Sequence, residues 1–147
     1  MKIVGVKHPG CDKLYWFGLD SHWLSVAKGS RVMCDTSMGN QLGIVETNLI
    51  EGDVEALKGQ LTGGKEYKRI LEIEMDVPIN NIIIPKYMTD AYPNKNLLIK
   101  RINEFYDLGG FDTKVQLTKD FRLRDGYTAW MVAKMMGLPT LKAFVAI

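Results

Sequence analysis

The stretch that decides the fold is Arg124-Asp125-Gly126-Tyr127-Thr128, near the carboxyl end of the chain. The Asp-Gly pair follows a short alternating segment and precedes apolar residues at helical spacing, so it predicts that a strand ends and a helix begins here. Immediately upstream, residues 114–118 and 121–124 flank the turn Lys119-Asp120 and predict a β-hairpin. Gly137 and Pro139 predict the end of the helix, and residues 141–147 predict a final strand.

Outward from this stretch, the second half of the chain continues with a strong helix signal. Pro93-Asn94 is typical of a helix start, and Gly109-Gly110 of a helix end. Between them the apolar residues predict one buried helix face, made of Leu98, Ile99, Ile102, Phe105 and Tyr106. Residues 76–85 contain two prolines and predict an extended segment before this helix.

The first half has a different pattern, with short apolar bursts separated by turn residues. The bursts predict strands at residues 2–6, 14–17, 31–35 and 41–45, and Gly39-Asn40 suits a tight hairpin turn between the last two. Residues 27–45 resemble the opening strands of SH3-like barrels. We therefore predict an α+β chain with a small β-barrel or β-roll at residues 1–52, a linker region at 53–75 and an α/β domain at 76–147. Within the linker region, residues 65–75 fit neither the helix nor the strand period.

Composition narrows the class of protein. The 147 residues are 46% hydrophobic and 24% charged, which is typical of a folded globular chain. The apolar runs are far shorter than the roughly 20 residues that cross a bilayer. The apolar stretch at the amino end is also too short for a secretory signal. We expect a cytoplasmic protein without a membrane partner. Residues 76–147 carry 10 Lys/Arg against 7 Asp/Glu, so an anionic partner would favour this half.

The residues from Leu123 to Lys134, followed by Gly137-Leu138-Pro139, resemble the core motif of the ParB/sulfiredoxin superfamily. The resemblance covers about residues 77–147, and the order of its elements is more specific than any single motif. It implies a bacterial or phage protein in which Gly126 and the following helix form the floor of a nucleotide or phosphate pocket. It also suggests CTP or ATP as ligand, although no cofactor is required by the sequence.

The chain departs from this family at the residues that carry chemistry. Sulfiredoxins have a catalytic cysteine directly after the glycine, where this chain has Tyr127. ParB proteins that hydrolyse CTP have an acidic residue and two arginines there, where this chain has Tyr127, Thr128 and Ala129. We therefore name no catalytic residue and favour a binding function over an enzymatic one.

The candidate ligand site consists of residues that could hold an anion. The amino end of a helix leaves backbone N–H groups unpaired and concentrates positive partial charge, which suits a phosphate. Cationic side chains just upstream could add donors. The predicted phosphate-binding residues are Lys119, Arg122, Arg124, Asp125, Gly126, Tyr127 and Thr128.

Each candidate also has a purely structural interpretation. Asp125 could be a helix N-cap, the hairpin cations could protect a sheet edge, and Trp130 is expected in the core. Tyr127 could pack in the core or stack on a nucleotide base, and the sequence does not decide between these two roles.

No metal site is predicted. His8, Cys11, His22 and Cys34 match no compact zinc spacing. Asp112, Asp120 and Asp125 are explained by hairpin and cap positions, without a metal.

Three functions follow as hypotheses. The leading one is a ParB-like binding module that recognises a nucleotide or nucleic-acid phosphate at the start of the Gly126 helix, with the amino-terminal barrel as an added interaction surface. The second is a phosphate-handling enzyme, a nucleotidase or nuclease, on the same scaffold. The third is a protein-binding accessory or inhibitory factor of mobile-element origin. The sequence leaves the oligomeric state open.

Overall fold

The computed structural model describes residues 1–20 and 26–147. The chain folds into two compact units, Met1–Glu74 with Ile147, and Met75–Ala146. We call them unit 1 and unit 2. No helix in the described ranges is long and apolar enough to cross a membrane.

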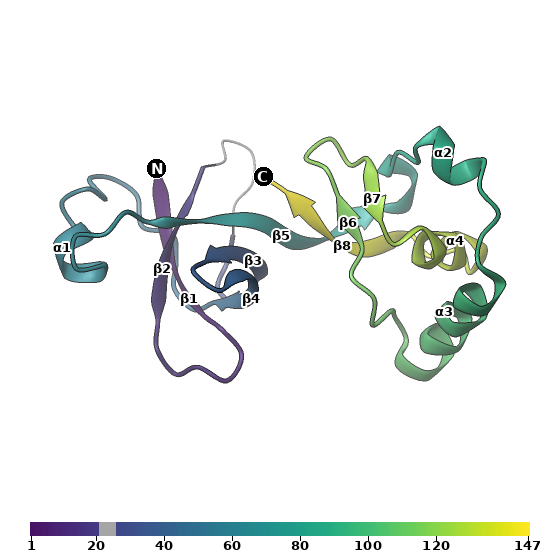
Figure 1. Cartoon of the computed structure of the whole chain (residues 1–147), viewed down its shortest axis with the longest axis horizontal. Coiled ribbons are helices and arrows are strands. Elements are labelled where there is room, and N and C mark those ends of the chain that lie inside the picture. The colour runs from purple at the N-terminus through teal and green to yellow at the C-terminus, as the bar shows by residue number, and fades with distance from the viewer. Residues whose placement is uncertain (21–25) are drawn as a thin grey trace. The chain divides into compact units, whose positions relative to one another are not determined.

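Unit 1 is a closed β-barrel (Figure 1). Its strands are β1 (Lys2–Lys7), β2 (Tyr15–Leu19), β3 (Arg31–Thr36), β4 (Gly39–Val45) and the first part of β5 (Lys68–Pro78). They hydrogen-bond in the order β2-β1-β4-β3-β5, and β5 pairs in parallel with β2, which closes the barrel. Closure leaves no free sheet edge among these strands. The chain is thus a mixed α+β protein, and the predicted strands of the first half are confirmed.

Alternating apolar residues build the barrel interior. In β1 and β3 the fully buried side chains at alternating positions are Val4, Val6, Val32 and Cys34. Ile3 points to the other face of β1 and packs with Val54 and Tyr67. The β3–β4 hairpin exists, but its turn lies earlier than predicted, at Ser37-Met38. The reason is the Thr36 hydroxyl, which accepts a hydrogen bond from Met38 N at 3.2 Å and donates one to Gly39 O at 2.6 Å.

The segment predicted as a linker, residues 53–75, contains the short helix α1 (Lys58–Leu61) and most of β5. Tyr67 is buried in this region, and its hydroxyl donates to Val54 O at 2.8 Å. Ile70, Glu72 and Ile73 are buried in β5, which pairs with β3 across a register shift. The shift explains why the apolar residues of this strand follow no single period.

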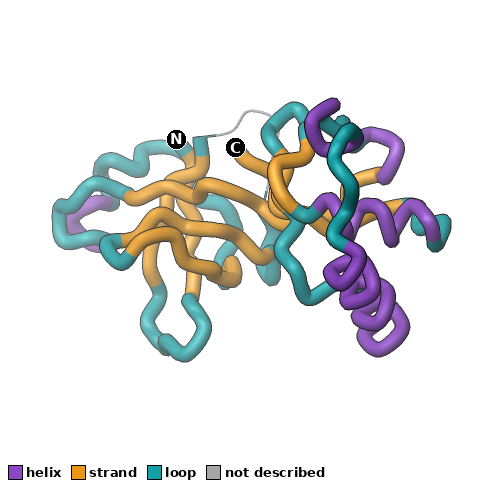
Figure 2. Tube along the Cα trace, turned by 45° about the vertical axis from the view of Figure 1, so that its right-hand side comes forward, coloured by secondary structure: helices purple, strands orange, loops and turns teal. Residues whose placement is uncertain are grey.

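Unit 2 combines short strands with helices (Figure 2). The end of β5 leads into the 3-10 helix η1 (Ile79–Asn81), which interrupts the extended segment predicted at 76–85. Then follow α2 (Lys86–Thr89), α3 (Lys95–Leu108), β6 (Gln116–Leu117), β7 (Leu123–Asp125), α4 (Tyr127–Met135) and β8 (Thr140–Ala146). β6 pairs in parallel with β8 and antiparallel with β7.

The core of unit 2 forms between its strands and α4. The buried residues include Val115, Leu117 and Leu123 from the hairpin region and Ala129 and Ala133 from α4. The small alanines let α4 approach the sheet closely, whereas α3 contributes no fully buried residue. Ile99 and Tyr106, predicted on the buried face of α3, are exposed.

Candidate functional site

The predicted site residues lie on the β6–β7 hairpin and the start of α4. A tight turn holds the hairpin, because Phe121 N donates to Thr118 O at 2.9 Å and Arg122 N donates to the Thr118 hydroxyl at 3.1 Å. Phe121 adopts a positive φ of 65°. Lys119 is exposed within this turn.

Arg122 and Arg124 are both exposed, and Leu123 between them is buried. β7 pairs through Leu117↔Leu123 and Gln116↔Asp125, so Arg124 is the extra residue of a β-bulge. Bulges redirect side chains and are frequent beside functional sites. Neither arginine, nor Lys119, forms an ion pair within residues 1–20 and 26–147. Their charges are therefore open to an anionic ligand.

Gly126 is the N-cap of α4, with φ 98° and ψ 27°. Its N–H donates to Asp125 Oδ1 at 2.8 Å. Asp125 therefore accepts a hydrogen bond from the N-cap residue and not from a helical N–H group. The N-cap interpretation of Asp125 is wrong. A Cβ added at Gly126 would lie 2.9 Å from Val115 Cγ2 and 3.1 Å from Val115 Cα. Sequence reasoning assigned this glycine to anion approach and missed Val115, which fills the space beside it.

The first turn of α4 has three backbone N–H groups outside the helical hydrogen-bond pattern, of which that of Ala129 is fully buried. The first helical hydrogen bond runs from Trp130 N to Gly126 O, at 3.0 Å. The N–H groups of residues 127–129 precede it, and no acceptor for them occurs in the described part of the chain. These groups carry the positive end of the helix dipole, which favours a negative ligand.

Thr128 lies within this turn and is only 8% exposed. Its hydroxyl has no hydrogen-bond partner among the residues that the structure describes. A hydroxyl can both donate and accept a hydrogen bond. Beside the N–H groups of Tyr127 and Thr128, this hydroxyl is a further donor that a ligand oxygen could use.

The aromatic pair Tyr127 and Trp130 packs against the core of unit 2. The two rings stack with centroids 5.9 Å apart and planes inclined by 15°, and Lys134 Nζ lies 5.3 Å from the Trp130 centroid. Trp130 thus contributes to packing, as its helical position suggested. The Trp130 indole N–H is buried, and it has no acceptor among the described residues.

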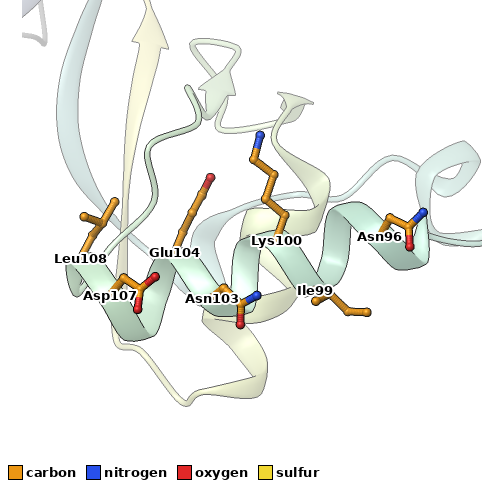
Figure 3. A pocket seen from close by; sticks show the side chains of 7 residues that line it. All are labelled: Asn96, Ile99, Lys100, Asn103, Glu104, Asp107 and Leu108. Carbon is orange, nitrogen blue, oxygen red and sulfur yellow. The ribbon is translucent and has the colours of Figure 1, made fainter.

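A shallow depression of about 450 Å³ lies along α3 (Figure 3), and none of its lining residues is a predicted site residue. Its lining comes from α3 alone, between Asn96 and Leu108. On this helix Arg101 and Glu104 form an ion pair of 2.5 Å, with side chains only 11% and 14% exposed. Arg101 Nε and Glu104 Oε2 are buried without hydrogen-bond partners in the described ranges.

Metal-binding groups do not converge in the part of the chain that the structure describes, where no three His, Cys, Asp or Glu side chains could share an ion. Of the zinc-type residues, His22 lies outside the described residues. Cys34 is fully buried in the barrel, and burial raises the pKa of its thiol to about 12. His8 is held by Leu42 O, 2.8 Å from His8 Nδ1.

Comparison with known proteins gives a distant likeness to one solved structure. No protein-family model matches the chain, and no curated protein matches it. Among solved structures, the C2221 form of a Pnob8-like ParB-N domain aligns with a TM-score of 0.44 and 18% sequence identity. The alignment covers 50% of this chain and 29% of that chain. Half of the chain thus has a distant structural likeness to a ParB-N domain.

Proposed function

We propose that this chain is a binding module for the phosphate of a nucleotide or nucleic acid, held at the amino end of α4. The observation that carries the proposal is the pair of N–H groups of Tyr127 and Thr128, which make no helical hydrogen bond, together with the hydroxyl of the 8% exposed Thr128. Donors at a helix start suit phosphate oxygens. The resemblance of residues 77–147 to ParB-like sequences agrees with this assignment.

Long-range attraction comes from Arg122, Arg124 and Lys119, which are exposed and carry no ion pair in the described ranges. A guanidinium can bind a phosphate through two parallel hydrogen bonds. The carboxylate of Asp125 opposes an anion, while its Oδ1 holds the Gly126 N–H. An Asp125→Asn variant keeps that acceptor and loses the charge, so phosphate binding should become tighter.

The test measures binding of CTP, ATP and a short single-stranded oligonucleotide by calorimetry and thermal shift. Thr128→Val removes the hydroxyl and keeps the side-chain shape, and Arg122→Ala with Arg124→Ala removes the charges. Each change should weaken binding roughly tenfold or more, since a hydrogen bond to a charged group is worth about 1.5–3 kcal/mol. Lys86→Ala is the matched control, because Lys86 is an exposed cation of unit 2 on α2.

The outcomes separate the three functions. If none of the three ligands binds at low salt, the proposed phosphate site is wrong. A role in binding a protein partner is then favoured. If the protein releases phosphate from CTP or ATP, and Asp125→Asn stops the release, the chain is an enzyme. Binding that Lys86→Ala weakens as much as the arginine variant would place the ligand elsewhere.

A further inference from the structure

Three large apolar side chains of unit 2 are exposed within ten residues of one another, between η1 and α3. Tyr92 is 99% exposed, Tyr87 68% and Ile83 50%. Neither tyrosine ring packs against another aromatic ring in the part of the chain that the structure describes. Aromatic side chains are usually covered, because their large apolar area gains most from leaving water. Exposed rings so close together in the chain indicate a surface that binds another molecule.

Main-chain hydrogen bonds place the first of these residues beside the β6–β7 hairpin. Ile83 N donates to Phe121 O and Leu123 N donates to Ile83 O, both at 2.9 Å, and Ile83 forms a parallel bridge with Arg122. Bridged residues project their side chains from the same face of a sheet. Ile83 and Arg122 are both exposed, whereas Ile82 and Leu123 are buried on the opposite face. The Arg122 cation therefore flanks the first exposed apolar side chain.

Chain length limits how far the two tyrosines lie from this arginine. Tyr87 follows Ile83 by four residues, so their Cα atoms are at most roughly 14 Å apart. Tyr92 comes five residues later and precedes the exposed Lys95, at the start of α3, by three. Neither Arg122 nor Lys95 forms an ion pair within residues 1–20 and 26–147. Both rings thus have an available cation nearby in the chain or across the bridge.

Rings interleaved with cations suit a single-stranded nucleic acid. Aromatic side chains stack on bases of any sequence, and cations attract the phosphates between those bases. In a duplex the bases are paired and stacked on one another, so their faces are closed to protein rings. The two exposed tyrosines therefore favour a strand whose bases are unpaired.

We propose that Ile83, Tyr87 and Tyr92 form a base-stacking surface for single-stranded nucleic acid, with one base on each tyrosine and the backbone beside Arg122. The inference rests on the proposed phosphate site at α4, and it narrows the ligand from a nucleotide or nucleic acid to a single strand. Sequence preference should be weak, because stacking and phosphate contacts do not read base edges.

The test measures the fluorescence anisotropy of a labelled single-stranded oligothymidylate about ten nucleotides long, within the usual site sizes of small single-strand binding domains. At low salt Tyr87→Ala and Tyr92→Ala should each weaken binding about fivefold or more, the loss expected for one stacked base. Tyr87→Phe and Tyr92→Phe keep the rings and should retain the affinity. Tyr106→Ala is the matched control, because Tyr106 is 72% exposed in the same unit but lies near the far end of α3.

A duplex of the same length gives a second check. Its charge density is higher, so electrostatic attraction alone would make the duplex bind more tightly than the strand. Stacking on the tyrosines predicts the reverse order. A duplex that binds at least as tightly as the strand would overturn the inference, and so would a Tyr106→Ala variant that loses as much affinity as Tyr87→Ala.

Calorimetry with CTP separates this inference from the proposed function. The tyrosine variants should leave CTP binding unchanged, whereas Arg122→Ala with Arg124→Ala should weaken the binding of both ligands. If CTP binds and the tyrosine variants do not alter strand binding, the phosphate site stands and the stacking surface is overturned. Equal losses of CTP and strand binding would also overturn it, because one nucleotide would then account for the stacking. If neither ligand binds, the proposed function is wrong and this inference fails with it.

Discussion

Gly126→Ala should destabilise the protein more than a glycine in a left-handed conformation normally would. Two effects act at this position. An L-residue at φ 98° carries left-handed strain of roughly 1–2 kcal/mol. The added Cβ would also lie 2.9 Å from Val115 Cγ2 and 3.1 Å from Val115 Cα. Since the second contact is with backbone, no side-chain rotation relieves it, and overpacking of this kind costs roughly 1–3 kcal/mol.

Gly137→Ala is the matched control. Gly137 also has a positive φ, of 70°, but a Cβ there meets nothing within 4 Å. Both variants lose the same entropy of the unfolded chain, so that contribution cancels in the comparison. The difference in free energy of unfolding between the two variants should therefore be about 1–3 kcal/mol, the overpacking cost alone.

Urea denaturation followed by tryptophan fluorescence measures both free energies, with the slope m checking that the unfolded state is unchanged. A double-mutant cycle with Val115→Ala adds a direct test, because removing Val115 Cγ2 should recover part of the loss at Gly126. Equal destabilisation by Gly126→Ala and Gly137→Ala, or no coupling in the cycle, would refute the argument. The expected result matters for the site. If Gly126→Ala destabilises the protein in this way, variants of Gly126 report on folding rather than on anion binding.

Three further predictions concern stability and reactivity. Cys11 is exposed and Cys34 is buried, so a thiol reagent should label one cysteine in the folded protein and two after denaturation. Burial raises the pKa of Cys34 to about 12, whereas an unfolded thiol ionises near pH 8.5. The stability that this thiol contributes is therefore complete below about pH 8.5 and is lost as the pH rises toward 12. The urea midpoint should fall over this pH range, and Cys34→Ala should reduce the fall. Asn94 Oδ1 accepts from Leu97 N at 3.1 Å at the start of α3, so Asn94→Ala should cost about 1 kcal/mol in thermal unfolding and Asn94→Asp should not.

Sequence patterns predicted those helices and strands whose apolar residues are regularly spaced or whose ends carry a capping residue. The strands of the barrel follow from apolar bursts, and α3 follows from Asn94 before it and Gly109 after it. The start of α4 was also predicted, since Gly126 lies directly before Tyr127. In each case the signal lies within a few neighbouring residues.

Other features depend on contacts between distant residues. The space beside Gly126 is occupied by Val115, eleven positions earlier, and no local pattern reveals this contact. The helix pattern of α3 included Ile99 and Tyr106 in the buried face, because periodicity measures spacing and not how much of a helix is covered. The phosphate-binding residues remain a prediction that awaits the binding measurements.

The division between the two units falls inside β5, since its residues up to Glu74 belong to unit 1 and those from Met75 to unit 2. The two units are therefore joined by a strand instead of a loop. Transplanting either unit into another protein would require cutting at an end of β5, because a cut at the boundary itself would leave each fragment with a broken strand.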